Sequence, residues 1–160
     1  MTQETESLIT DEMRASIGRE GSPTVYEIEK LGIRQYARAV GHIDPLFYDE
    51  DYARSKGHRS LVAPPRYLGQ SPIRSASYGG PGAQMQQGGR RWRALDGGSE
   101  HNYTGIEICA GDVLTAVTRT TDIKQREGRL GPMLITSRET VYTNQNGEVV
   151  CRVVGTGIQY

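Results

Sequence analysis

A histidine and an aspartate stand two residues apart in the stretch GHIDPLFYDEDYARSKG, which covers residues 41–57. Side chains at that spacing in a loop can reach each other, so His42 could act as a general base with Asp44 orienting its imidazole. Histidines in loops are also often solvated or structural, and no other residue of the stretch completes an acid/base pair. The pattern predicts either a catalytic pair or the shell of a site whose chemistry lies elsewhere.

The other motifs that could carry chemistry are less specific. His58 and His101 are isolated in the sequence, and neither an H-x-x-x-H nor a C-x-x-C pattern occurs, so we expect no metal site and no cofactor. Residues 79–89, GGPGAQMQQGG, could be taken for a phosphate cradle. They lack the G-x-x-x-x-G-K-[ST] pattern and its strand-to-helix context, so we interpret them as a glycine-rich loop or lid.

Arginines surround the only tryptophan in GGRRWR, residues 88–93. Arg91, Trp92 and Arg93 could contact the phosphate of a nucleotide or of pantetheine. They fit equally well a solvated strand with one packed ring, or a contact between subunits. Both interpretations stay open, and the three residues are candidates for substrate binding.

The composition limits the classes of protein to consider. A chain of 160 residues has the length of one domain, and its low apolar content (36%) and 20 glycines suggest many loops or a core completed by another subunit. The 19 basic and 19 acidic residues balance, so we expect neither nucleic acid nor a membrane surface as a partner. A net charge near zero is compatible with oligomerisation.

The N-terminus and the cysteines indicate a cytoplasmic protein. The first residues are acidic and polar, without the features of a signal peptide, and we expect residues 1–7 to be flexible. No apolar run is long enough to span a bilayer. Cys109 and Cys151 lie in apolar, strand-like surroundings; a disulfide between them is conceivable, but two buried free thiols fit a cytoplasmic protein better.

Helix signals dominate the first half of the chain. Apolar spacing and capping residues predict helices over residues 8–17, 33–40 and 49–56. Between the first two, residues 24–29 alternate between apolar and polar and predict a strand. Because proline is tolerated in the first turn, Pro64 and Pro65 can begin a further helix that runs through Tyr67 and Leu68.

The second half is predicted to be a meander of long strands. Tight turns at residues 127–131 and at Asn146-Gly147 join three strands, and a further strand precedes them. Together with residues 24–29 they predict an antiparallel sheet, with the helices inserted between its first two strands, in an α+β domain. Strands of this length suggest a curved sheet wrapped around a helix.

Two long segments carry a resemblance to a known family. IRQYARAVGHIDPLFYDEDYARSKGHRSLVAPPRYL and LDGGSEHNYTGIEICAGDVLTAVTRTTDIKQREGRLGPMLITSRETVYTNQNGEVVCR resemble the N-terminal-type (FAS1-like dehydratase) domain of the MaoC-like dehydratases and hydratases, over roughly residues 8–160. The resemblance implies a single hot-dog domain over residues 1–160, in which a long central helix starting near Pro65 is wrapped by a curved antiparallel sheet. Within that family the chain resembles the non-catalytic subunits of heterodimeric (3R)-hydroxyacyl-thioester dehydratases.

The sequence departs from that family at the catalytic positions. Catalytic members carry S-G-D-x-N-P-x-H, whose Asp and His hold the water that is added to or removed from the thioester substrate, while a backbone N–H at the start of the central helix polarises the thioester oxygen. Here the pattern falls on residues 40–47, where His42 replaces the Asp and Phe47 replaces the His. Pro64-Pro65 replaces a His-Gly at the start of the helix, and a proline has no N–H to offer.

The resemblance therefore implies a substrate-binding subunit that acts with a catalytic MaoC-like hot-dog partner, in a heterodimer or heterotetramer, on an acyl-CoA or acyl-ACP. The complex would be a (3R)-specific enoyl-thioester hydratase or 3-hydroxyacyl-thioester dehydratase, and the isolated chain would be inactive. Two alternatives stay open: a self-sufficient homodimeric hydratase using His42 and Asp44, and a non-enzymatic acyl-thioester-binding module. Phe47 and Tyr67 are the expected tunnel walls, and the other expected substrate contacts are Pro64, Pro65, Arg91, Trp92 and Arg93.

Overall fold

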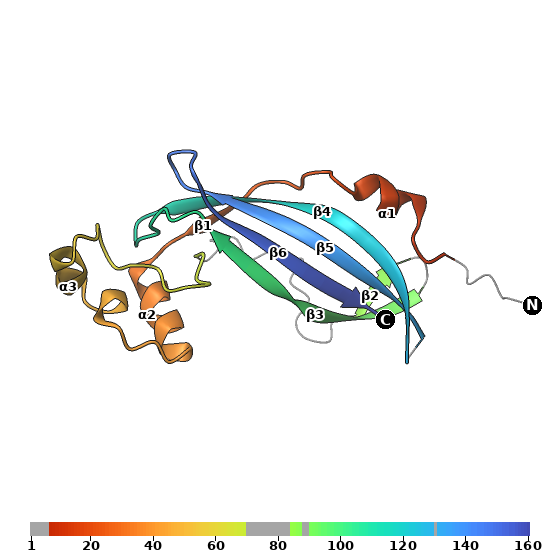
Figure 1. Cartoon of the computed structure of the whole chain (residues 1–160), viewed down its shortest axis with the longest axis horizontal. Coiled ribbons are helices and arrows are strands. Elements are labelled where there is room, and N and C mark those ends of the chain that lie inside the picture. The colour runs from red at the N-terminus through yellow and green to blue at the C-terminus, as the bar shows by residue number, and fades with distance from the viewer. Residues whose placement is uncertain (1–6, 70–83, 88–89, 130) are drawn as a thin grey trace, which may run out of the picture.

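A curved antiparallel sheet forms the body of the molecule (Figure 1). The computed structural model describes residues 7–69, 84–87, 90–129 and 131–160. Within these ranges the sheet has six strands in the order β1-β4-β5-β6-β3-β2. They are β1 (Thr24–Glu27), β2 (Gln84–Gln87), β3 (Arg90–Tyr103), β4 (Val113–Gly128), β5 (Gly131–Thr143) and β6 (Val149–Gln159).

The helices are short, and local capping explains where they begin and end. They are α1 (Asp11–Ser16), α2 (Lys30–Ala39), the 3₁₀ helix η1 (Pro45–Phe47) and α3 (Glu50–Ser55). The side chains of Thr10 and Asp49 each accept a backbone N–H from the first turn of α1 and α3. Gly41 and Gly57 follow α2 and α3 with φ of 76° and 92°, a conformation that ends a helix most easily at glycine. The three helices predicted before residue 57 are confirmed: α1 and α3 are shorter than predicted, whereas α2 begins three residues earlier and is longer.

The predicted meander of long strands is also confirmed. β4, β5 and β6 pair in sequence as antiparallel neighbours. The predicted Asn146-Gly147 turn joins β5 to β6, and there the Gly147 N–H donates to the carbonyl of Asn144 at 3.0 Å, with φ of 80° at Gly147. The domain is therefore α+β, with α2 and α3 between β1 and β2 in the chain.

Two predicted elements differ in the structure. No helix begins at Pro65: residues 64–67 form a turn closed by the hydrogen bond from the Tyr67 N–H to the Pro64 carbonyl, and in it Arg66 has φ of 72°. An α-helix cannot continue through such a residue, so the predicted helix through Tyr67 and Leu68 is wrong within the described residues. Of the predicted glycine-rich loop 79–89, residues 84–87 form β2, which pairs with residues 90–93 of β3. The remainder of that loop, and residues 1–6 of the predicted flexible N-terminus, lie outside the described residues.

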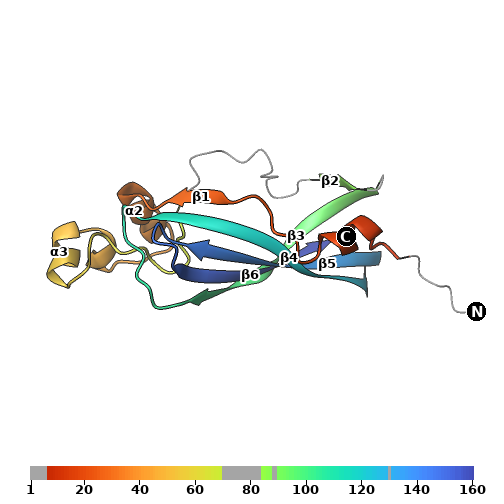
Figure 2. The ribbon, with the colours of Figure 1, turned by 90° about the horizontal axis from the view of Figure 1, so that it is seen from above.

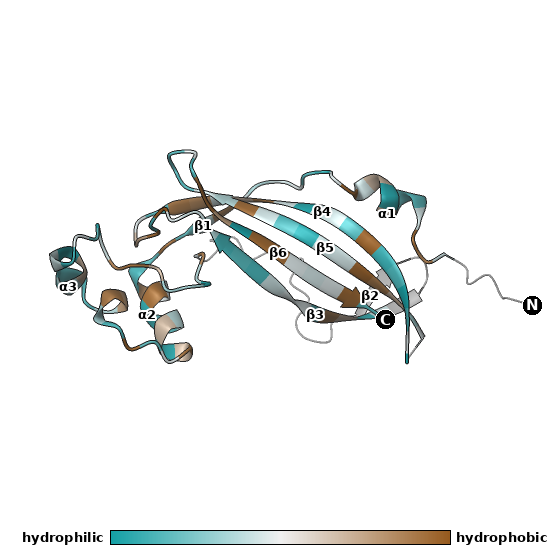
Figure 3. Cartoon of the chain, in the orientation of Figure 1, coloured by the Kyte–Doolittle hydropathy of each residue, from teal (hydrophilic) through white to brown (hydrophobic). Residues whose placement is uncertain are grey.

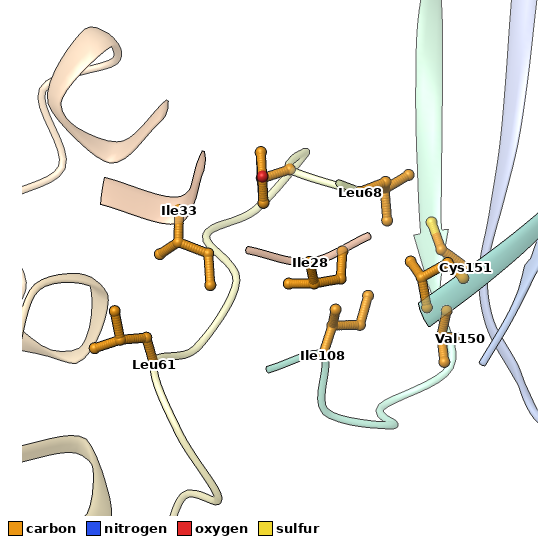
Figure 4. Close-up of a cluster of buried hydrophobic side chains, with 9 residues drawn as sticks. Ile28, Ile33, Leu61, Leu68, Ile108, Val150 and Cys151 are labelled. Carbon is orange, nitrogen blue, oxygen red and sulfur yellow. The ribbon is translucent and has the colours of Figure 1, made fainter. Parts of the chain in front are cut away.

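The hydrophobic core lies at one end of the sheet, beside α2. Figure 4 shows Ile33 of α2 next to Leu61, with Ile28 and Ile108 between this pair and Cys151 of β6. Tyr67 and Leu114 belong to the same cluster, and Phe47 and Tyr142 pack against it. Cys109 and Cys151 are both buried and are not joined by a disulfide, as expected.

The two edges of the sheet differ. Beyond β1, residues 17–21 run along the outer edge of β4, where the N–H groups of Gly18 and Gly21 each donate at 2.8 Å to carbonyls of β4. At the other edge, residues 94–103 of β3 pair with β6 and, among the described residues, with no second strand. Figure 2 shows α1 and α2 at opposite ends of the sheet. None of the described helices has the length and apolar character needed to cross a membrane.

Candidate functional site

The loop that follows α2 carries the first predicted pair of catalytic residues, and the pair does not form. Asp44 caps η1, because its carboxylate accepts the Leu46 N–H at 3.0 Å. The imidazole of His42 lies instead against the ring of Phe47, with 5.5 Å between ring centroids. In the described part of the chain no hydrogen bond joins His42 to Asp44. The loop is braced by Tyr48, whose hydroxyl donates to the His42 carbonyl at 2.6 Å.

This arrangement has no group that could move a proton at the position of Phe47. A phenyl ring neither gives nor accepts a proton, and the Asp44 carboxylate is already used as a helix cap. The loop therefore offers an apolar and aromatic surface. An acid/base pair would have to be completed from outside it.

Three of the predicted substrate contacts lie together near the core. Phe47 packs against the core cluster that contains Tyr67, and Pro64 is fully buried. Tyr67 is 5% exposed, and its ring lies 5.5 Å from that of Tyr36. Among the described residues its hydroxyl has no hydrogen-bond partner, and it lies so close to Gly32 of α2 that a Cβ at that position would collide with it. Burial, and next the nearby Glu29, raise the pKa of Tyr67.

The turn after Pro64 does not offer the backbone donor that a catalytic member needs. Pro65 is exposed and has no N–H. The next two N–H groups are already bonded: that of Arg66 donates to the Tyr103 hydroxyl at 2.7 Å, and that of Tyr67 to the Pro64 carbonyl at 3.0 Å. No N–H of residues 65–67 is therefore free to polarise a thioester oxygen.

The remaining predicted contacts lie at the other end of the sheet. Arg91 and Trp92 are in β3 beside β2, and Trp92 is buried whereas Arg93 is exposed. The backbone of Arg93 exchanges two hydrogen bonds with Tyr160. Along β3, Trp92 and Tyr103 are separated by roughly 35 Å of extended strand. Within this chain Phe47, Pro64 and Tyr67 therefore lie together, whereas Arg91, Trp92 and Arg93 lie far from them.

A second cluster of titratable groups was not predicted. Residues 61–63 pair with residues 108–110, and this pairing brings the side chains that flank both segments together. His58 Nδ1 contacts the Glu107 carboxylate, which also accepts the Cys109 thiol at 3.1 Å. Arg59 donates two hydrogen bonds to Asp112, at 3.0 and 2.9 Å. We call these five side chains the ionic cluster. No pattern of short spacing in the sequence indicated it, because its members lie up to 54 residues apart.

The ionisation of the ionic cluster fits a structural role. Burial, assisted by Glu107, raises the pKa of the Cys109 thiol to about 12, so the thiol stays protonated and is not a nucleophile at neutral pH. Burial opposes ionisation of Glu107, but hydrogen bonds from Cys109 and His58 outweigh it and lower the pKa of that carboxyl. The pKa of Asp112 is lowered in the same way by Arg59, the Cys109 N–H and Gln145. Nowhere in the described ranges do three or more His, Cys, Asp or Glu residues form a possible metal site.

Comparison with known proteins places residues 15–153 in the family described as "FAS1-like, dehydratase domain region". The UPF0336 protein Lxx02810 of Leifsonia xyli is 31% identical over 142 residues, which cover 87% of this chain and 89% of that protein. The UPF0336 protein Franean1_6066 of Parafrankia sp. is 32% identical over 148 residues, which cover 88% of this chain and 92% of that protein.

Solved structures share the fold at lower identity. A chain of the C-terminally truncated HadBC (3R-hydroxyacyl-ACP dehydratase) complex of Mycobacterium tuberculosis matches with a TM-score of 0.67 and 20% identity, over 94% of this chain and 99% of that chain. A chain of the ChsH1-ChsH2 complex of the same organism matches with a TM-score of 0.62 and 17% identity, over 87% of this chain and 87% of that chain. A MaoC-like dehydratase from Rhodospirillum rubrum matches with a TM-score of 0.56 and 21% identity, over 89% of this chain and 90% of that chain. The predicted hot-dog fold is confirmed.

Proposed function

The chain belongs to the family of FAS1-like dehydratase domain regions, and from that premise we propose that it is the substrate-binding subunit of a (3R)-specific enoyl-thioester hydratase or 3-hydroxyacyl-thioester dehydratase. A MaoC-like hot-dog chain with an intact acid/base pair would be its partner. The acyl group would be carried by CoA or by an acyl carrier protein, and the complex would work in the cytoplasm.

The observation that carries this proposal is the state of the loop after α2. His42 packs on Phe47, and Asp44 caps η1, so neither carboxylate nor imidazole is paired for proton transfer. The N–H groups of Arg66 and Tyr67 are engaged within the chain. A dehydratase-type domain without an acid, a base or an oxyanion donor can still supply the walls of an acyl-binding site.

The shape of the sheet supports a partner chain. Residues 94–103 of β3 form an edge that pairs on one side only within the described residues. An unpaired edge strand can add a strand from another chain. The matched structures named HadBC and ChsH1-ChsH2 are complexes of two different subunits, and we propose the same kind of assembly here.

In the proposed complex the chemistry belongs to the partner. Its acid/base pair would deliver a water hydroxyl to C3 of the enoyl thioester and a proton to C2, or reverse both steps, and no group of this chain changes its protonation state. This chain would hold the acyl group so that C2 and C3 lie beside the partner's pair. Phe47 and Tyr67 would contribute through apolar and aromatic contact.

The test is a reconstitution. This chain, a MaoC-like chain encoded next to it, and the two together are assayed for hydration of crotonyl-CoA and of a longer enoyl-CoA. We expect turnover that needs the partner and that this chain raises at least tenfold for the longer substrate. A partner whose own catalytic His is replaced by Gln is the matched control and should abolish turnover.

Two other outcomes of this assay would each favour one of the alternative functions. Full turnover by this chain alone would refute the proposal and favour a homodimeric hydratase that uses His42 and Asp44. Binding of an acyl-CoA in calorimetry, without any effect on the partner's turnover, would favour a non-enzymatic thioester-binding module.

A further inference from the structure

The sheet face that carries the core becomes polar toward its middle. Side chains alternate between the two faces of a strand, so Tyr142, Thr140 and Arg138 of β5 share the face on which the core cluster packs. Figure 3 shows the middle of β4 and β5 coloured mainly as polar residues, with hydrophobic residues nearer the strand ends. The face therefore changes from apolar to polar along the direction of the strands.

A hollow of about 350 Å³ lies in this polar part. Its lining comes from four strands, and we call it the polar groove. The residues that matter for its chemistry are Asp96, Ser99, Thr118, Arg138, Thr140 and Gly155.

Glycines keep the polar groove open. Gly155 and Gly157 stand two residues apart on β6 and both line it. Neither has a positive φ, and a Cβ added to either would meet no atom of the described residues within 4 Å. Neither backbone conformation nor packing in the described part of the chain requires glycine at these positions, and glycine weakens a strand. Their effect is to leave space beside Arg138, which pairs directly with Gly155 across the strands.

Arg138 is the cation of the polar groove. Its side chain is exposed, and among the described residues its guanidinium makes no ion pair and no hydrogen bond. Among the described lining residues the one carboxylate is that of Asp96, which accepts the Gly98 N–H at 2.8 Å. An unpaired guanidinium in a concave site is suited to bidentate binding of a planar oxyanion.

Hydroxyl groups surround this cation. The hydroxyls of Thr118 and Thr140 lie 2.8 Å apart and share a hydrogen bond on the groove floor. Ser99 lies across Gly155 from Arg138 in the strand register, and it accepts a hydrogen bond from the Arg66 guanidinium at 3.0 Å. Arg66 thus brings a second positive charge to the rim. An oxyanion bound here would find two guanidiniums and several hydroxyls, and the apolar part of the lining, to which Val153 contributes, would contact the acyl chain that carries it.

We propose that the polar groove binds an oxyanion at the far end of the acyl group, such as the second carboxylate of a dicarboxylic acyl thioester. This deepens the function proposed above and rests on it for the position of the thioester. Arg138 lies four positions along β5 from Tyr142 at the core, which is about 13 Å along the strand from the apolar end. A linear acyl chain of medium length spans that distance.

The first experiment measures binding to this chain alone by calorimetry. Sebacate, a linear dicarboxylate, is the probe, and decanol is the probe without a carboxylate. We expect sebacate to bind and decanol not to bind, and sebacate binding to weaken as salt is raised. The expected effect of Arg138→Gln is at least a tenfold rise in the Kd for sebacate.

Two further variants control for folding and for charge. Gly155→Val fills the polar groove with a residue that favours strands, and it should weaken sebacate binding as strongly as Arg138→Gln. Arg126→Gln removes an exposed arginine from the opposite face of β4 and should leave the Kd within twofold. Thermal unfolding of each variant verifies that the loss is not a loss of fold. The proposal is overturned if sebacate binds the Arg138→Gln variant as tightly as the wild type, or if it does not bind the wild type at all.

A phosphate of the carrier could supply the same oxyanion chemistry, and a second arm of the experiment separates the two sources. Inorganic phosphate and free CoA are titrated against the same variants. If either binds through Arg138 more tightly than sebacate and displaces it, the oxyanion comes from the carrier and the assignment to the acyl end is wrong. These measurements need no turnover. Failure of the reconstituted pair would therefore count against the proposed function, and failure of sebacate binding against the polar groove.

Discussion

Two places in the molecule combine a histidine with an acidic residue, and they differ in outcome. In the loop after α2, His42 and Asp44 are two residues apart, and no hydrogen bond joins them within the described residues. In the ionic cluster, His58 and Glu107 are 49 residues apart and in direct contact. Proximity in the sequence was a poor guide to pairing.

The difference has a local cause on one side and a tertiary cause on the other. Asp44 precedes Pro45, the first residue of η1, and an aspartate there is drawn to the free N–H groups of the helix. The ionic cluster exists because residues 61–63 pair with residues 108–110. The Asp44 contact therefore stabilises only a local turn, whereas the ionic cluster holds two distant segments together. We expect mutations in the two places to lower the free energy of unfolding by different amounts.

The largest effect is expected at Asp112. Asp112→Ala removes the acceptor of two Arg59 hydrogen bonds and leaves the buried Cys109 N–H without its partner. We expect a loss of about 3 kcal/mol in the free energy of unfolding. Urea denaturation followed by circular dichroism measures it. A loss below that caused by Asp44→Ala would show that the ionic cluster does not fasten the fold.

The same cluster should make stability depend on pH on the acid side. The pKa values of Asp112 and Glu107 are lowered in the folded state, so their contribution is complete above the unfolded pKa of about 4 and is lost as the pH falls through the folded values. Urea midpoints between pH 7 and pH 3 should fall less steeply for Asp112→Asn than for the wild type. Parallel curves would contradict this.

A smaller loss is expected at Glu107. Glu107→Gln keeps the shape of the side chain and removes the charge that faces His58, while the Cys109 thiol can still donate to the amide oxygen. Because both side chains of the His58–Glu107 pair are partly exposed, we expect about 1 kcal/mol. Thermal unfolding at neutral pH measures the change, with Glu127→Gln at the exposed end of β4 as the matched control.

The effect at Asp44 should be smaller still. Asp44→Ala removes the cap of a 3₁₀ helix that is only three residues long and lies near the surface. We expect a loss of about 0.5 kcal/mol, and Asp44→Asn, which can still accept the Leu46 N–H, should recover it. If Asn at this position abolished turnover of the reconstituted complex, Asp44 would have a chemical role after all.

No effect on catalysis is expected at His42. In the reconstituted pair, His42→Ala should leave kcat within twofold, because the imidazole faces Phe47 and no acid. Its pH–rate profile should also keep its shape, since the titrating groups belong to the partner. A loss of a hundredfold or a missing limb of the profile would restore His42 as a catalytic residue.

Much of the fold was predictable because its signals are local. The caps at Thr10 and Asp49, the alternation of β4 to β6 and the Asn146-Gly147 turn each depend on residues a few positions apart. The predicted helix at Pro65 failed for a tertiary reason: the Arg66 N–H is bonded to Tyr103, a residue of β3, and the turn keeps Tyr67 in the core.

The predicted site was only partly assembled by the structure. Phe47, Pro64 and Tyr67 lie near one another, whereas Trp92 and Arg93 lie at the far end of β3. No pattern in the sequence could show that separation, because it depends on which end of a long strand meets the core. The same holds for Arg138 and Gly155, which become neighbours only through the pairing of β5 with β6.

By itself the sequence determined the α+β class, the order of the elements and the absence of a proton-transferring group at Phe47, because chemistry and local conformation follow from residue type and short spacing. Only the tertiary structure decided that His58 meets Glu107 and that Arg138 faces an open polar groove. Contacts between distant residues depend on strand register and on which surfaces are buried together, and both are set by the whole chain.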